Sequence, residues 1–316
     1  MTLASLCSGQ GGQYAGMFDL TGDAPQASAL FAHASALLGD DPRLLVKRAE
    51  GDVLHANRTA QLLCTLQALS AAALLDDALP KRRCVAGYSV GEVAAWGVAG
   101  LIGANETLDL VAARAEVMDA ASHGEEGMLF IRGLGKVSIE QLCAGREAAI
   151  AICNPADAWV LGGRNVALET IAEQAVRLGA VRVVSIPVNV PSHTYLLADA
   201  SVAFRHVLAG MHLQPSPRTG TRLFSGIDGD AVLDAKNDVN KLALQISQSI
   251  QWATCLEGCV EAGAGAFLEL GPGRALADMA ATAYPHIPAR SLDDFHSVQG
   301  VLDWLSRFIE RTCPTT

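Results

Sequence analysis

Short runs of apolar residues alternate along the chain with longer segments in which apolar residues recur every three or four positions. The short runs predict buried β-strands at residues 3–7, 84–86, 223–225 and 266–270. The longer segments predict helices at residues 59–79, 91–101, 106–121, 196–209 and 239–259, with another from Arg274 onwards. Strands that alternate with helices are typical of an α/β protein with a mostly parallel sheet.

The middle of the chain follows a different pattern, in which strands outnumber helices. Strands are predicted at residues 127–131, 148–153, 158–161 and 181–186, and helices at 138–144 and 165–178. The order β-α-β-β-α-β is the split βαβ pattern of ferredoxin-like folds. We therefore expect a small ferredoxin-like subdomain at residues 125–189. It would be inserted into a large α/β body formed by residues 1–124 and 190–316.

Composition and charge exclude several classes of protein. The chain has 316 residues, of which 50% are hydrophobic and 18% charged, as in a compact α/β protein rather than a disordered or fibrous one. The net charge is −10 and no long run of Lys or Arg occurs, so we expect no nucleic-acid partner. We find neither an apolar run that could span a bilayer nor a signal-peptide pattern. We therefore expect no membrane association and a cytoplasmic location.

The eight cysteines do not form the C-x-x-C spacing of a zinc or redox site. Cys255 and Cys259 lie four residues apart on one face of a predicted helix, where two soft metal ligands could meet. Buried free cysteines that act as small hydrophobic residues are the commoner arrangement. We therefore expect no metal site and a reducing compartment.

Residues 87–91 have the sequence Gly-Tyr-Ser-Val-Gly, a G-x-S-x-G pattern between a predicted strand and a predicted helix. The glycines allow a tight strand-to-helix turn that exposes the hydroxyl of Ser89. The amide of Val90 then lies in the first turn of a helix, where unpaired N–H groups favour negative charge and can bind an oxyanion. The pattern predicts a serine nucleophile, and the alternative is an ordinary loop serine between small residues.

A serine nucleophile requires a base, and three of the eight histidines are candidates by position. His193 follows Pro191 and Ser192, directly after a strand-like segment at residues 188–190, and active-site loops gather at strand ends. His286 and His296 are rivals, and the periodicity of the sequence does not choose among the three.

Arg114 is the other residue with a candidate role, because it lies inside an apolar helical segment. An arginine in such surroundings is unusual unless a carboxylate pairs with it. The alternative is a long side chain that extends from the segment to a solvated helix face.

Taken together, these motifs resemble those of the malonyl-CoA:acyl carrier protein transacylase family over nearly the whole chain. Several short motifs stand in the family's order, which is more specific than any one of them. They are Gly-Gln-Gly-Gly-Gln at 9–13, Gly-Tyr-Ser-Val-Gly-Glu at 87–92, Arg114 with Met118, Gly-Met at 127–128, Asn-Pro at 154–155, Gly-Gly at 162–163, Val-Pro-Ser-His at 190–193, Gln245 with Gln-Trp at 251–252, and Glu269 with Gly-Pro-Gly at 271–273.

The resemblance implies an α/β-hydrolase-like body with a parallel sheet and an inserted ferredoxin-like subdomain. It implies an acyltransferase that moves malonyl from CoA to the phosphopantetheine thiol of an acyl carrier protein. The reaction would be a ping-pong cycle through an ester on Ser89, with His193 as general base. Malonyl-CoA and the carrier protein would be the partners, and no cofactor is implied beyond the CoA thioester that serves as substrate.

The family's other site residues correspond to matching positions of this sequence. The backbone amides of Gln10 and Val90 would hold the oxyanion. Arg114 would bind the malonyl carboxylate in a bidentate pair and so select a charged acyl group. The main-chain carbonyl of Gln245 would orient His193 in place of an aspartate.

The sequence departs from the family's pattern at four positions, none of which removes a catalytic atom. Ser8, Tyr88, Thr194 and Ser249 stand where proline, histidine, cysteine and proline are usual. Tyr88 and Asn154 would line the acyl pocket, so the change at Tyr88 bears on which acyl group the site prefers.

Other functions share parts of this pattern. The Gly-Tyr-Ser-Val-Gly and Ser-Gly-Gln-Gly-Gly-Gln variants also resemble the transacylase subunit of malonate decarboxylase, and a stand-alone acyltransferase of polyketide synthesis is a third setting beside fatty acid biosynthesis. A serine esterase or thioesterase would need a late histidine, such as His286 or His296, and would give Arg114 no task. A scaffold protein without turnover would not need Ser89, His193 and Arg114 together.

Overall fold

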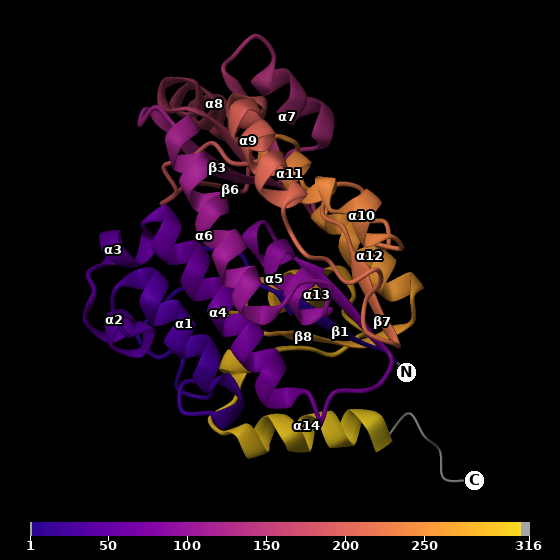
Figure 1. Ribbon diagram of the computed structural model, residues 1–316. Helices are drawn as coiled ribbons and strands as arrows, with labels where there is room; N and C mark the ends of the chain where they lie inside the picture. Colours follow the sequence, from indigo (N-terminus) through magenta and orange to yellow (C-terminus); the bar gives the residue numbers. More distant parts are fainter. Residues whose placement is uncertain (1, 311–316) are drawn as a thin grey trace.

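The computed structural model describes residues 2–310, which contain two separate β-sheets. The larger sheet has five strands in the order β7-β2-β1-β8-β9, and its strand pairs are parallel. The smaller sheet has four strands in the order β4-β5-β3-β6, and its strand pairs are antiparallel. Figure 1 shows the smaller sheet with α7 and α8 above the larger one. The predicted α/β fold with a parallel sheet and a second, smaller unit is confirmed.

The larger sheet forms the centre of the body. Its strands are β1 (Thr2–Cys7), β2 (Arg83–Gly87), β7 (Thr221–Phe224), β8 (Ala264–Glu269) and β9 (Ala289–Ser291). Residues of β1, β2 and β8 are almost all buried on both faces, as expected for parallel strands covered by helices.

Twelve α-helices within residues 2–310 belong to the body. They are α1 (Ser28–Leu38), α2 (Pro42–Arg48), α3 (Gly51–His55), α4 (Asn57–Leu75), α5 (Val90–Val98), α6 (Ala104–Ala121), α9 (Ala198–Ala209), α10 (Ala235–Asp238), α11 (Asn240–Ser247), α12 (Trp252–Glu261), α13 (Ala275–Ala283) and α14 (Val298–Glu310). Short 3₁₀ turns occur at η1 (Pro25–Ala27), η2 (Tyr195–Leu197) and η3 (Leu292–Asp294). None of the described helices is both long enough and apolar enough to cross a bilayer.

The smaller unit follows the predicted β-α-β-β-α-β order. Its elements are β3 (Glu126–Arg132), α7 (Lys136–Cys143), β4 (Ala148–Asn154), β5 (Ala158–Arg164), α8 (Asn165–Arg177) and β6 (Arg182–Ile186). It has its own hydrophobic core, which includes Leu129, Ile139, Leu161 and Ile171, apart from the core of the body. The second core supports a subdomain at residues 125–189, although the boundaries themselves stay a prediction.

The segment at residues 239–259, which is predicted to be largely helical, contains two separate helices. Helix α11 ends at Ser247 and α12 begins at Trp252. Between them the amide of Ile250 donates to the carbonyl of Ala151 at 2.9 Å, and the amide of Cys153 donates to the carbonyl of Ile250 at 2.8 Å. The helical segment is interrupted because the backbone of Ile250 pairs with β4. This pairing joins the body to the smaller unit.

A second difference lies just before His193. Residues 188–190 are predicted as strand-like, but β6 ends at Ile186 and the chain continues as a loop without regular structure. The sequence pattern also gave no indication of the helices between residues 25 and 55, or of β9 and α14.

Candidate active site

Ser89 lies at the turn between β2 and α5, with φ of 57° and ψ of −121°. A Cβ on Gly87 would lie 2.0 Å from the carbonyl oxygen of Gly91, and one on Gly91 would lie 2.1 Å from the carbonyl oxygen of Cys7. Both positions therefore require glycine. A serine held in this region of φ and ψ costs about 1–3 kcal/mol, as is common at functional sites.

His193 is bonded directly to Ser89. The distance from Ser89 Oγ to His193 Nε2 is 2.8 Å, and His193 Nδ1 lies 2.5 Å from the main-chain carbonyl oxygen of Gln245. A carbonyl can only accept, so Nδ1 carries the proton and Nε2 is free to accept one from the serine. The histidine is buried, and burial together with the nearby charge of Arg114 lowers its pKa to about 3. The imidazole is therefore neutral at physiological pH.

The loop that carries His193 is fixed by α11 rather than by a strand end. His193 has φ of 65°, and its amide donates to the carbonyl of Ile246 at 2.8 Å. The two rival histidines, His286 and His296, are both exposed. The structure thus places His193, rather than either rival, against Ser89.

Arg114 projects from α6 into the same site and is 1% exposed. Its Nη1 donates to Gln61 Oε1 at 2.6 Å, and its Nη2 donates to Gln245 Oε1 at 3.1 Å. Within residues 2–310 it forms no ion pair with a carboxylate, and because it is buried it does not extend to a solvated face, so neither of the two alternatives left open by the sequence describes it. Burial lowers the pKa of Arg114 to about 10, and the charge of Glu92 opposes this shift. A buried cation held by neutral amides can still bind an anion.

Gln245 connects these groups to one another. Besides its contacts with His193 and Arg114, its Nε2 donates to the carbonyl of Ser89 at 3.0 Å and to Glu92 Oε2 at 2.6 Å. The sequence pattern assigned no role to Gln61 or Glu92. Gln61 is detectable in principle, because it is a polar residue inside an apolar helical segment.

The loop at residues 8–13 passes directly beside Ser89. A Cβ on Gly9 would lie 2.9 Å from the carbonyl oxygen of Tyr88 and 3.7 Å from Ser89 Cβ. Gln10 follows Gly9, and Val90 is the first residue of α5. The backbones that carry the two predicted oxyanion donors are thus brought to the same serine.

Two polar side chains hold this loop in place. Ser8 Oγ donates to Glu269 Oε1 at 2.7 Å, and the amide of Ala277 donates to Glu269 Oε2 at 2.8 Å. Gln13 accepts from the amide of Gly11 at 2.5 Å and donates to the carbonyl of Leu54 at 2.9 Å. The change from the usual proline to Ser8 therefore adds a hydrogen bond to a buried glutamate.

The predicted pocket residues Tyr88 and Asn154 are neighbours. The ring of Tyr88 packs edge-on against Trp252, with 5.4 Å between centroids and an interplanar angle of 83°. Burial raises the pKa of the Tyr88 hydroxyl, and a contact with Asn154 opposes the shift. Asn154 also borders a cavity of about 150 Å³ between the smaller sheet and α13.

A cleft of about 450 Å³ opens beside Gln10. Its walls include Asn57 at the start of α4, Ser122 at the end of α6, and Asn189 and Val190 in the loop before His193. The cleft therefore lies between the body and the loop that leads from the smaller unit to the base.

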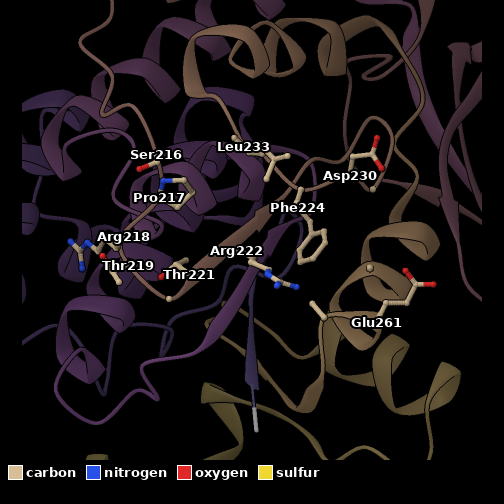
Figure 2. A pocket seen from close by; sticks show the side chains of 16 residues that line it. Ser216, Pro217, Arg218, Thr219, Thr221, Arg222, Phe224, Asp230, Leu233 and Glu261 are labelled. Carbon is tan, nitrogen blue, oxygen red and sulfur yellow. The ribbon is translucent and has the colours of Figure 1, made fainter.

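Another cavity, of about 670 Å³, lies beside the edge strand β7, and neither Ser89 nor His193 lines it. Figure 2 shows Arg222 and Phe224 of this strand between Leu233 and Glu261. No histidine or cysteine lines this cavity. Across residues 2–310, no group of three or more His, Cys, Asp or Glu side chains could hold a metal ion.

Residues 5–283 match the acyl transferase domain family. The malonyl CoA-acyl carrier protein transacylase of Mycobacterium tuberculosis is 30% identical over 299 residues, which cover 92% of this chain and 96% of the relative. The transacylase of the same name from Haemophilus influenzae is 28% identical over 313 residues, covering 96% and 98% of the two chains.

This chain is also similar to solved structures of malonyl transferases. An acyl-carrier-protein S-malonyltransferase from Burkholderia pseudomallei superposes with a TM-score of 0.88 at 27% identity, covering 96% of this chain and all of the other. A malonyl-transacylase solved in complex with a type II polyketide acyl-carrier protein has a TM-score of 0.88 at 26% identity, over 96% and 99% of the chains. From its sequence, its fold and the arrangement of Ser89, His193 and Arg114, this chain belongs to the malonyl-CoA:acyl carrier protein transacylase family.

Proposed function

We propose that this protein transfers a malonyl group from CoA to the phosphopantetheine thiol of an acyl carrier protein, through an ester on Ser89. The observation that carries the proposal is a buried arginine beside a serine–histidine pair. Arg114 and His193 both contact Gln245, and His193 contacts Ser89 Oγ. A hydrolase has no use for such a cation, whereas a transferase of a carboxylate-bearing acyl group does.

In the first half-reaction Ser89 Oγ attacks the thioester carbonyl while His193 Nε2 takes the hydroxyl proton. The carbonyl oxygen becomes an oxyanion, which the backbone amides of Gln10 and Val90 stabilise. When the carbon–sulfur bond breaks, the proton on His193 passes to the CoA sulfur. The products are CoA and malonyl-Ser89, with His193 neutral again.

The second half-reaction reverses these roles with a different thiol. The phosphopantetheine thiol of the carrier protein gives its proton to His193 and attacks the ester carbonyl. The bond to Ser89 Oγ then breaks, and His193 returns the proton to the serine. Because the carbonyl of Gln245 holds Nδ1, the same Nε2 serves both halves of the cycle.

Arg114 selects the acyl group. Its guanidinium would form a bidentate pair with the free malonyl carboxylate, where each charge-assisted hydrogen bond contributes about 1.5–3 kcal/mol. Acetyl or an unsubstituted fatty acyl group would leave the buried charge without this partner. Tyr88 and Asn154 would border the acyl group and limit its size.

The cleft beside Gln10 is the proposed route for the thioester. The phosphopantetheine arm carries amide groups, and the side-chain amide of Asn189 offers a matching donor and acceptor along the cleft. We also propose a cytoplasmic location, which the seven free thiols among residues 2–310 support.

The test is a steady-state assay with malonyl-CoA and separate phosphopantetheine-bearing carriers from fatty acid synthesis, polyketide synthesis and malonate decarboxylation. We expect malonyl-carrier as the product with at least one of them. Double-reciprocal plots should give the parallel lines of a ping-pong mechanism. Release of free malonate with no transfer to any carrier would instead indicate a thioesterase.

A further inference from the structure

Glu92 is a buried carboxylate beside the site, and the reaction described above gives it no task. It lies in the first turn of α5 and is fully inaccessible to solvent. A carboxylate near a helix N-terminus is favoured, but complete burial opposes its charge and raises its pKa to about 7.

The side-chain amide of Gln245 is oriented by the groups around it. Its Nε2 faces two acceptors, which are the carbonyl of Ser89 and Oε2 of Glu92, and its Oε1 faces the donor Nη2 of Arg114. If the amide were flipped, its oxygen would face these acceptors and its NH₂ group would face the guanidinium. In its ionised form Glu92 can only accept, so it adds a second acceptor, beside the carbonyl of Ser89, that disfavours the flipped orientation.

The carboxylate of Glu92 is itself held in one position. A Cβ on Gly226 would lie 2.6 Å from Glu92 Oε2, so the loop after β7 closes directly over it. The ionisable groups whose charges act on Glu92 or respond to it are Arg114, Asp228 and Cys255. Asp228 is paired with Lys241 at 2.9 Å.

From this geometry we propose that Glu92 is a positioning residue for acyl selection. It fixes the amide of Gln245, which in turn holds the guanidinium of Arg114 where the carboxylate of the acyl group binds. Glu92 touches neither the substrate nor the reacting atoms. The proposal rests on the proposed function, because it concerns the discrimination between malonyl and neutral acyl groups.

The test is a mutant cycle on the rate at which Ser89 is acylated, measured by intact-protein mass spectrometry with malonyl-CoA and with acetyl-CoA. Glu92→Gln keeps the size of the side chain but replaces the carboxylate with an amide that can also donate, so it weakens the preference of the Gln245 amide for one orientation. We expect the ratio of malonyl to acetyl rates to fall about 10- to 100-fold. In an Arg114→Ala background the same substitution should change that ratio by no more than about twofold.

Two further variants separate positioning from folding. Gln245→Met keeps the main-chain carbonyl that holds His193 but removes the amide, so it should reproduce the loss of discrimination. This variant also completes the test if Glu92→Gln does not fold. Glu269→Gln is a matched control, because Glu269 is equally buried and contacts Ser8 and Ala277 instead of Gln245. Because Glu269 is bonded to Ser8 in the loop that carries Gln10, this variant should change the malonyl and acetyl rates together and leave their ratio unchanged.

An unchanged ratio in folded Glu92→Gln, or an equal fall with and without Arg114, would overturn the proposal. Failure of the unaltered protein to form any malonyl ester is a different result, because it would refute the proposed function itself.

Discussion

At Arg114, two neutral amide oxygens from Gln61 and Gln245 hold a buried guanidinium. We predict that Arg114→Ala lowers the rate of malonyl loading at least about 100-fold, because two charge-assisted hydrogen bonds to the acyl carboxylate are lost. The same change should raise the rate of acetyl loading, since no unpaired charge remains. Stopped reactions followed by mass spectrometry measure both rates.

A suitable control for this substitution is Arg146→Ala. Arg146 lies in the smaller unit, where it donates to the carbonyl of Leu142 and to Gln174. It should leave both rates unaltered. If Arg114→Ala reduces malonyl and acetyl loading equally, Arg114 has a structural role and does not select the acyl group.

Single substitutions also test whether His193 is the general base. His193→Ala should reduce acylation of Ser89 by about 100- to 10,000-fold, because it removes the Nε2 atom that is bonded to Ser89 Oγ and takes its proton. His286→Ala should have little effect, since that residue is exposed. Strong loss in His286→Ala together with an active His193→Ala protein would favour a hydrolase-type triad.

At the scale of elements, the turn between β2 and α5 depends on close backbone packing. We predict that Gly91→Ala lowers the free energy of unfolding by about 3 kcal/mol or more, because the added methyl group would lie 2.1 Å from the carbonyl oxygen of Cys7. Gly135→Ala is the control, since a Cβ there meets nothing within 4 Å and φ is −68°. Urea denaturation measures both, and similar stabilities would show that the turn can relax.

How far the sequence predicts these elements depends on whether local pattern or tertiary contact decides them. Buried strands such as β1 and β2 are apolar runs that end at glycines, so they are recognisable. The break between α11 and α12 is not recognisable from the sequence, because it results from hydrogen bonds between Ile250 and β4. Residues 188–190 look like a strand because they alternate apolar and polar side chains, but no strand in the described part of the chain pairs with them.

In the candidate site, too, some features follow from local sequence pattern and others only from tertiary contacts. The glycines around Ser89 and the order of motifs indicate the nucleophile, the base and the arginine. The contact between Glu92 and Gln245 joins residues 153 positions apart and has no local signature. Arg114 is bound by the side-chain amides of Gln61 and Gln245, which only the packing of α4, α6 and α11 reveals.

At the scale of the whole molecule, buried carboxyls make stability depend on pH. Burial raises the pKa of Glu269 to about 7, against 4.5 for an ordinary glutamate. The native protein therefore binds more protons than the unfolded chain between these values. This contribution to stability is fully present below pH 4.5 and is lost as the pH rises through 7.

Glu269→Gln tests this account because the amide cannot ionise. The free energy of unfolding of the variant minus that of the unaltered protein should be about 2 kcal/mol larger at pH 8 than at pH 5. Denaturation at the two pH values measures the change. A difference that is independent of pH would mean that Glu269 ionises normally in the folded protein.

The whole assembly serves to hold an ester on Ser89 until a thiol arrives, and that ester is the most direct observable. The decisive measurement is intact-protein mass spectrometry after mixing with equal amounts of malonyl-CoA and acetyl-CoA, on the unaltered protein and on Ser89→Ala. We predict a mass increase of one malonyl group, located on Ser89 by peptide mapping and absent from the variant. Acetylation in preference to malonylation, or a malonyl group that persists in Ser89→Ala, would contradict the account.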